Sequence, residues 1–242
     1  MYAVFKRELF SLLNSLMAYM TIGVFLLALG LLLWVFPDTS MLEYGYAELN
    51  GFFSLAPFLF MFLIPAITMR SFAEERREGT YILLATRPLT VWQIVLAKYF
   101  SCLVLVLFAL LPTLIYYYTI AQLGFPKGNV DGGAVAGAYI GLLLLGSCFA
   151  AIGVFASAIT KNQVVAFAIA VFSCFISYNG FEALSKLFTL QFAEGILLGL
   201  SVNEHYQSIG RGVLDTRDLV YFISFTAVFL GLTKLLIGGR KW

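Results

Sequence analysis

The side chains most capable of chemistry are few in this sequence and are not spaced for a catalytic or metal site. His205 is the only histidine and follows Glu204, so a bound metal would lack the further ligands that it needs. Serine, histidine and aspartate occur, but in no arrangement that suggests a nucleophile with its base. We therefore expect no catalytic residue and no metal site, and interpret His205 as a polar loop contact.

Three cysteines and one glutamate lie within long apolar stretches. Cys102, Cys148 and Cys174 have no disulfide or metal-site spacing, so we interpret them as small packing residues. Glu182 is a candidate for a transport pathway, because an ionisable residue near lipid is often functional. Its position near the end of its stretch favours an ordinary interfacial residue instead, and both interpretations stay open.

The densest group of charges, Ala73–Glu78, lies between two apolar stretches and contains both signs. Gly79 interrupts the helix expected there, and Thr80 can cap a short, mostly apolar helical turn that Pro88 ends. A short helix held between two breaks is a rigid element that a soluble partner could push. An ordinary loop with solvated charges is the alternative, and the residues alone do not decide between them.

The elements around this group follow from composition. Of 242 residues, 61% are hydrophobic and only 12% are charged, with a mean hydropathy of +0.93. Soluble domains are about 25% charged, so the composition indicates a membrane protein. A bilayer core of roughly 30 Å needs about 20 apolar residues in a helix. We therefore expect an all-α, polytopic protein with six spans, at about residues 16–36, 52–69, 99–123, 133–159, 164–184 and 219–237.

The segments between these spans have patterns of their own. Residues 1–15 place apolar and charged side chains on opposite faces, which predicts a helix in the membrane interface; a frayed extension of the first span is the alternative. Residues 70–98 form the largest charged loop, in which Thr90 can cap a helix that enters the third span. Residues 185–218 contain an apolar piece too short to cross, which favours an outer re-entrant or interfacial segment. Residues 1–242 then form one transmembrane domain.

Lysine and arginine are distributed unequally around the spans. Lys127, Lys186, Arg211 and Arg217 lie on one side. The positive-inside rule makes the other side cytoplasmic, so both termini are predicted to be cytoplasmic. The eleven basic residues on that side are Lys6, Arg7, Arg70, Arg76, Arg77, Arg87, Lys98, Lys161, Lys234, Arg240 and Lys241.

Gly133, Gly137 and Gly141 recur at every fourth residue of the fourth span. Such a spacing makes one helical face smooth and lets another backbone approach closely. The pattern predicts helix packing rather than chemistry.

Several segments resemble the ABC-2 type transporter permease family. In the charged loop, the likeness is carried by R-S-F-A-E-E-R-R-E-G-T, which starts at Arg70, by L-L-A-T-R-P-L-T and by I-V-L-A-K. The N-terminal K-R-E-L-F-S-L-L-N-S-L-M-A-Y, which starts at Lys6, also fits. The segment from His205 to Phe222 and the terminal Gly-Arg-Lys-Trp are most similar to the permease subunit of the gliding-motility-associated ABC system.

The resemblance implies a permease subunit of an exporter in the bacterial cytoplasmic (inner) membrane, with the ABC-2, type V exporter-like fold. ATP and Mg²⁺ would bind a separate ABC ATPase subunit, because this sequence contains no GxxxxGK[ST] phosphate loop. A second permease chain, identical or related, and membrane lipid would be the other partners, without nucleic acid. The chain itself would bind no cofactor and would not be an enzyme.

Matching the family motif residue by residue assigns the ATPase contact to the charged loop. Tyr81–Arg87 would be the docking helix, and Thr160–Gln163 would be a second, smaller contact. The individual candidates are Glu74, Glu75, Arg76, Arg77, Glu78, Gly79, Thr80, Tyr81, Leu83, Leu84, Arg87 and Lys161.

Three functional classes remain open at this point. The chain could be a permease that moves a substrate, a permease-like subunit that transmits mechanical force without one, or an unrelated six-span scaffold. Coupling to an ATPase separates the first two classes from the third. A transported compound separates the first class from the second.

Overall fold

A computed structural model gives the fold of the chain. It describes residues 1–37, 40–41, 48–80, 89–125, 130–185, 195, 198–210, 212 and 215–239. The named elements of this part are all helical: α1 (Tyr2–Leu13), α2 (Leu16–Trp34), α3 (Asn50–Thr68), α4 (Arg70–Glu78), α6 (Val91–Leu110), a 3-10 turn (Leu111–Thr113), α7 (Leu114–Leu123), α8 (Gly132–Ile159), α9 (Gln163–Phe175), a π-helical turn (Ile176–Gly180), α10 (Phe181–Ser185), α12 (Val202–Gly210) and α13 (Thr216–Gly238).

In the part of the chain that the structure describes, six helical segments are long and apolar enough to cross a membrane, which agrees with the predicted all-α class and the predicted six spans. Two of them extend well beyond the apolar stretches on which the prediction was based. α3 continues into α4 with only Met69 between them. α6 begins at Val91, where Thr90 and Gln93 form a capping box. The six segments are Leu16–Trp34, Asn50–Glu78, Val91–Leu123, Gly132–Ile159, Gln163–Ser185 and Thr216–Gly238.

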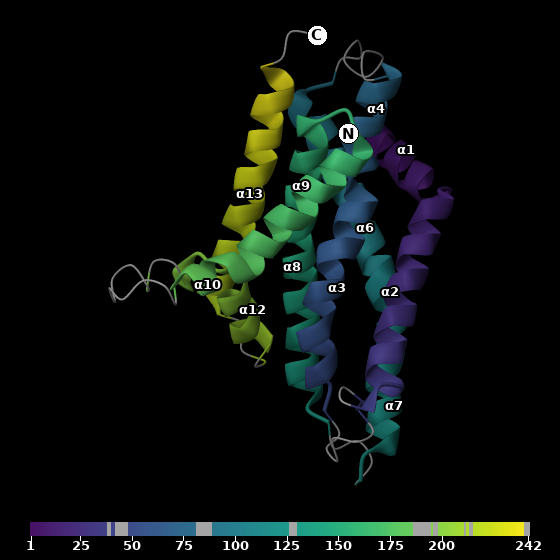
Figure 1. Cartoon of the computed structure of the whole chain (residues 1–242), viewed down its shortest axis with the longest axis vertical. Coiled ribbons are helices and arrows are strands. Elements are labelled where there is room, and N and C mark those ends of the chain that lie inside the picture. Colours follow the sequence, from purple (N-terminus) through teal and green to yellow (C-terminus); the bar gives the residue numbers. More distant parts are fainter. Residues whose placement is uncertain are drawn as a thin grey trace.

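The central helix of the bundle is α8. It packs against α3, α4, α6, α9, α12 and α13, whereas α2 lies at one side of the bundle (Figure 1). Small residues allow α8 to take this position, because they let neighbouring backbones come close. The closest case is Gly153, where a Cβ atom would lie 1.9 Å from Oγ1 of Thr68 on α3.

Two of the three predicted packing glycines lie against another element. A Cβ atom on Gly141 would lie 3.0 Å from Cγ2 of Ile209 on α12, and one on Gly137 would lie 3.3 Å from Cα of Gly212. Gly133 lies in the first turn of α8, and the nearest described atom to its Cβ position is Oδ1 of Asp131, which caps that helix. Gly141 thus packs against α12, and Gly137 packs against Gly212, just after α12.

The first helix and the C-terminal end of the last helix lie at the same end of the bundle. α1 packs along α6 near α4, and the C-terminal end of α13 lies at the same end (Figure 1). The ammonium group of Lys234 on α13 lies 5.3 Å from the ring centre of Trp92 on α6, which joins the two helices there. We call this the α4 end.

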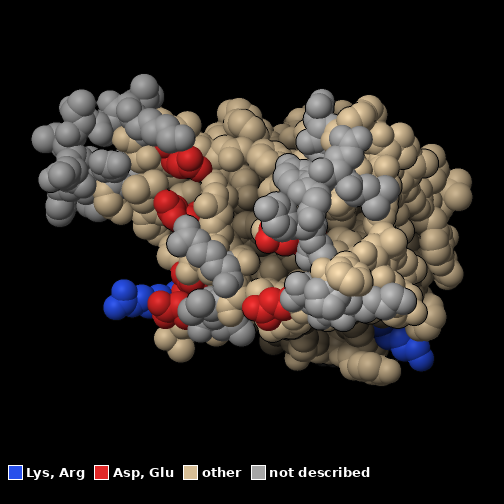
Figure 2. Space-filling view, turned by 90° about the horizontal axis from the view of Figure 1, so that it is seen from below, with Lys and Arg blue, Asp and Glu red and all other residues tan. Residues whose placement is uncertain are grey.

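The other end of the bundle carries α7 and α12 (Figure 1). Viewed from this end, Asp and Glu side chains are spread over the described surface, and the visible Lys and Arg side chains lie at its edges (Figure 2). α12 packs against α8 and α13, and the hydroxyl of Tyr206 donates to the carbonyl of Phe53 over 2.7 Å. Much of the predicted outer segment 185–218 lies outside the described residues.

Candidate functional site

Most of the predicted ATPase-contact residues lie on α4 and directly after it. Gly79 ends α4 with a left-handed backbone, φ 74°, a conformation that favours glycine. Thr80 follows, and its hydroxyl donates to the carbonyl of Glu75 over 3.4 Å. The break predicted at Gly79 is therefore where the helix ends. The candidates on α4 are Glu74, Glu75, Arg76, Arg77 and Glu78.

The second predicted contact lies close to α4. Lys161 is exposed in the turn between α8 and α9, and α4 packs against both of these helices. The guanidinium of Arg76 donates to the carbonyl of Ala158, which joins α4 to the end of α8. The predicted docking helix Tyr81–Arg87 lies outside the described residues, as do its candidates Tyr81, Leu83, Leu84 and Arg87.

Ser157 of α8 holds the junction between α3 and α4. Its hydroxyl oxygen accepts from the backbone N–H of Phe72 (2.9 Å) and of Ala73 (3.0 Å), and the hydroxyl donates to the carbonyl of Met69 (2.9 Å). The first N–H groups of a helix lack partners within the helix, so a side chain from elsewhere must satisfy them. A buried serine on α8 thereby fixes the start of α4.

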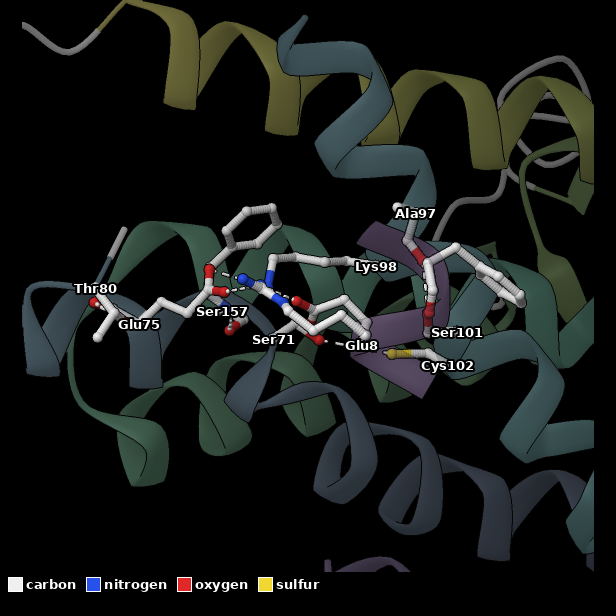
Figure 3. Close-up of polar contacts among 12 residues, drawn as sticks. Glu8, Ser71, Glu75, Thr80, Ala97, Lys98, Ser101, Cys102 and Ser157 are labelled. Atoms are coloured by element: carbon white, nitrogen blue, oxygen red, sulfur yellow. Dashed lines mark hydrogen bonds and ion pairs between the residues drawn. The ribbon is translucent and has the colours of Figure 1, made fainter. Parts of the chain in front are cut away.

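A buried ion cluster joins α4 to α1 and α6. Lys98 of α6 has a side chain only 1% exposed, and its Nζ lies 3.0 Å from Oε2 of Glu8 and 3.0 Å from Oε2 of Glu75 (Figure 3). The Glu75 contact is an ion pair without the alignment of a hydrogen bond. Arg7 contacts Glu8 and lies 2.9 Å from Oε1 of Glu75. Lys98 Nζ also lies 5.0 Å from the ring centre of Phe72.

The charges of this cluster compensate one another. Burial by itself would raise the pKa of Glu8, but the charge of Lys98 and hydrogen bonds from Arg7 and Lys98 hold this pKa below its usual value. With both carboxylates ionised, the four groups Arg7, Glu8, Glu75 and Lys98 have no net charge. Lys98 is the most buried of the four, and removing it would leave the largely buried carboxylates of Glu8 and Glu75 with the half-exposed Arg7, which costs several kcal/mol. The cluster therefore holds three helices in one arrangement.

A polar cavity of about 560 Å³ lies beside the cluster, between α1, α4 and α6. Several predicted contact residues line it, whereas Arg76 points instead to α8 and Arg77 is 59% exposed. This end of the bundle thus combines a fixed inner face with an exposed charged face. The predicted contact residues that line the cavity are Glu74, Glu75, Glu78 and Thr80.

Three residues that position α4 were not predicted as site residues. Glu8 and Lys98 carried a signal, since each is a charge close to a long apolar stretch, where an ionic partner is expected. Ser157 carried none, because nothing in the sequence relates it to residues 69–73, more than 80 positions away. Long-range pairing of this kind requires the fold.

Glu182 and His205 lie away from this site. Oε2 of Glu182, on α10, accepts from Nδ2 of Asn203 over 2.9 Å. His205 lies in α12 rather than in the loop that the sequence suggested; its Nδ1 is 2.6 Å from Oδ1 of Asp218, and its ring stacks on Tyr221. Both residues join α10, α12 and α13 to one another, so their described contacts are structural.

Comparison with known proteins bears on the identity of the chain. A family model described as ABC-2 family transporter protein matches residues 37–240, which include every described helix from α3 to α13. A search of curated proteins gave no match. The match covers most of the 242 residues. It agrees with the six described helical segments that are able to cross a membrane. The chain belongs to the ABC-2 family of transporter proteins, as a membrane component.

Proposed function

We propose that this chain is the transmembrane permease subunit of an ATP-driven exporter and that α4, with the predicted docking segment Tyr81–Arg87, receives the motion of a separate ABC ATPase subunit. The observation that carries the proposal is the attachment of α4. Ser157 and Arg76 tie α4 to α8, and the Lys98 cluster ties it to α1 and α6. A displacement of α4 would therefore act on three other helices at once, without a flexible joint to absorb it.

The exposed face of α4 suits a charged protein partner. Arg77 and Glu78 are 59% and 52% exposed, and they form only a loose pair at 3.9 Å. Lys161 adds a third exposed charge on the turn between α8 and α9. Charges of both signs on a rim guide the orientation of a partner and make the association dependent on salt.

The charge distribution supports an orientation in which the α4 end is cytoplasmic. Eleven of the 15 Lys and Arg residues fall on the side of the predicted spans that contains α4, whereas acidic residues are spread over the opposite end (Figure 2). Both termini would then be cytoplasmic, where a soluble ATPase is available. We place the protein in the bacterial inner membrane on this ground and on its family.

The sequence supports a division of functions between this chain and a separate ATPase. The chain contains no GxxxxGK[ST] phosphate loop, so ATP and Mg²⁺ would be held by the partner ATPase. A second permease chain, identical or related, would complete the pathway for export. The likeness of the segment from His205 to Phe222 supports a place in a gliding-motility-associated system.

Co-purification tests the proposed coupling. We expect an ABC ATPase to co-purify with the chain from detergent. The ATPase recovered with the double variant Glu74→Ala/Glu78→Ala should fall roughly fivefold. Each of these two partly exposed charges is expected to contribute up to about 0.5 kcal/mol to the free energy of ATPase binding. Gly79→Pro should retain almost none, since proline cannot adopt φ 74° and the end of α4 would be rebuilt. The readout is the ATPase recovered per permease chain.

The matched control is Glu48→Ala, an exposed carboxylate just before α3, at the opposite end of the bundle. It should retain as much ATPase as the unmodified chain. Glu75 is avoided here, because its loss would disturb the Lys98 cluster as well as the surface. If no ATPase co-purifies, or if all variants behave like Glu48→Ala, the coupling assignment is wrong.

A further inference from the structure

An apolar groove runs along the outside of the bundle where α2, α3 and α9 meet. Its volume is about 650 Å³, and none of the described residues that line it is acidic. A second hollow of about 460 Å³ continues it between α3 and α9, with Phe62 and Phe167 lining both. The side chains that define the groove include Met20 and Val24 of α2, Leu63 and Ala66 of α3, and Phe167 of α9.

One end of this groove is polar, and its polar group is incompletely satisfied. Arg70 and Ser15 line that end as well as the polar cavity that contains Glu8, Glu74, Glu75 and Glu78, and Nη1 of Arg70 donates to Oγ of Ser15 over 3.3 Å. Nε of Arg70 is buried and has no hydrogen-bond partner among the described residues, and no described carboxylate lies within 4.0 Å of this guanidinium. A buried donor without an acceptor is costly, so an acceptor from outside the chain is expected here.

The groove is long enough to hold an acyl chain over the thickness of one bilayer leaflet. α3 has 19 residues and is therefore about 28 Å long, close to the roughly 30 Å of a hydrocarbon core. Arg70 begins α4 just beyond the end of α3, so a bilayer whose hydrocarbon core is spanned by α3 would bring lipid headgroups near this guanidinium. Along α2, the groove runs from Ser15 to Ala28, about 20 Å at the rise of a helix, and a single leaflet spans about 15 Å.

We infer that the groove is the binding site of an anionic membrane phospholipid, with its phosphate on Arg70 and an acyl chain against α2, α3 and α9. A guanidinium presents a planar fork of donors that matches phosphate oxygens. The apolar lining offers an acyl chain contact along its length. A second copy of this chain is a weaker occupant, because an apolar helix face would leave Nε of Arg70 without an acceptor. The site does not depend on coupling to an ATPase.

Lipid titration followed by native mass spectrometry tests this site. The probes are phosphatidylglycerol and phosphatidylcholine, added to the full-length chain in detergent. We expect one phosphatidylglycerol per chain to bind more tightly than phosphatidylcholine. Arg70→Gln should weaken phosphatidylglycerol binding about tenfold, the change expected for one charge-assisted hydrogen bond, and Arg70→Lys should restore part of it. Ala66→Trp should weaken both lipids, because the new side chain fills the groove.

The matched control is Arg77→Gln, which removes the same charge from α4 outside the groove. It should leave the binding of both lipids unchanged, and the melting temperature of each variant shows that it is folded. Equal binding by Arg70→Gln and the unmodified chain would overturn the assignment. A dimer whose formation is blocked by Ala66→Trp, with no lipid retained, would also overturn it and assign the groove to a second copy.

Discussion

Replacing Lys98 with methionine is expected to lower the free energy of unfolding by about 3–5 kcal/mol, the cost of breaking a buried ion pair by removing one partner. Lys98 is 1% exposed and lies 3.0 Å from a carboxylate of Glu8 and from one of Glu75. Without Lys98, Arg7 is the one basic partner that the described residues leave to the carboxylates of Glu8 and Glu75. Methionine keeps most of the volume, so the loss measures charge rather than packing. Denaturant titration in mixed micelles measures the effect.

The matched control for this variant is Arg77→Met. Arg77 is 59% exposed, and its nearest described carboxylate is 3.9 Å away, so its loss should cost less than about 1 kcal/mol. The triple variant Glu8→Gln/Glu75→Gln/Lys98→Met should recover much of the stability, because no buried charge is then left alone. If Lys98→Met lowers the free energy of unfolding no more than Arg77→Met does, the ion cluster does not stabilise the fold.

Gly153→Ala is the second substitution with a large expected effect. Its Cβ would lie 1.9 Å from Oγ1 and 2.8 Å from Cβ of Thr68, distances at which α3 and α8 must move apart. Overpacking of a close-packed interior costs about 1–3 kcal/mol, and we expect the upper end because Thr68 is fully buried. The melting temperature in detergent should fall accordingly.

Two further variants distinguish this clash from a general effect of alanine. Gly23→Ala on α2 has no atom within 4 Å of the new Cβ and should stabilise the helix slightly. Gly153→Ala/Thr68→Ala should recover part of the lost stability, because Oγ1 and Cγ2 of Thr68 are then gone. Equal effects of Gly153→Ala and Gly23→Ala would contradict the close approach of α3 and α8.

The sequence predicts those features that depend on local pattern. Apolar length predicts six spans, because helices must satisfy their backbone groups within lipid. The structure has a helix cap at Thr90 and the end of α4 at Gly79, both at the positions that the sequence predicts. The match to the ABC-2 family then agrees with the motif that starts at Arg70.

Other features depend on contacts between distant residues and could not be predicted. Glu8, Glu75 and Lys98 form one cluster although they come from three separate helices. The regular glycines at 133, 137 and 141 pointed to helix packing, yet the described glycine whose Cβ position lies nearest another helix is Gly153, outside this run of three. The continuation of α3 into α4 depends on Ser157, a residue of another helix.

Photo-cross-linking from α4 tests the central claim most directly. A photoreactive amino acid replaces Glu78, which is 52% exposed on α4, or Glu48 at the opposite end as the control. The account predicts a cross-link from position 78 to a protein whose peptides contain GxxxxGK[ST], the mark of an ATPase, and none from position 48. No such cross-link from position 78, or equal cross-linking from position 48, would contradict the claim that α4 receives the ATPase.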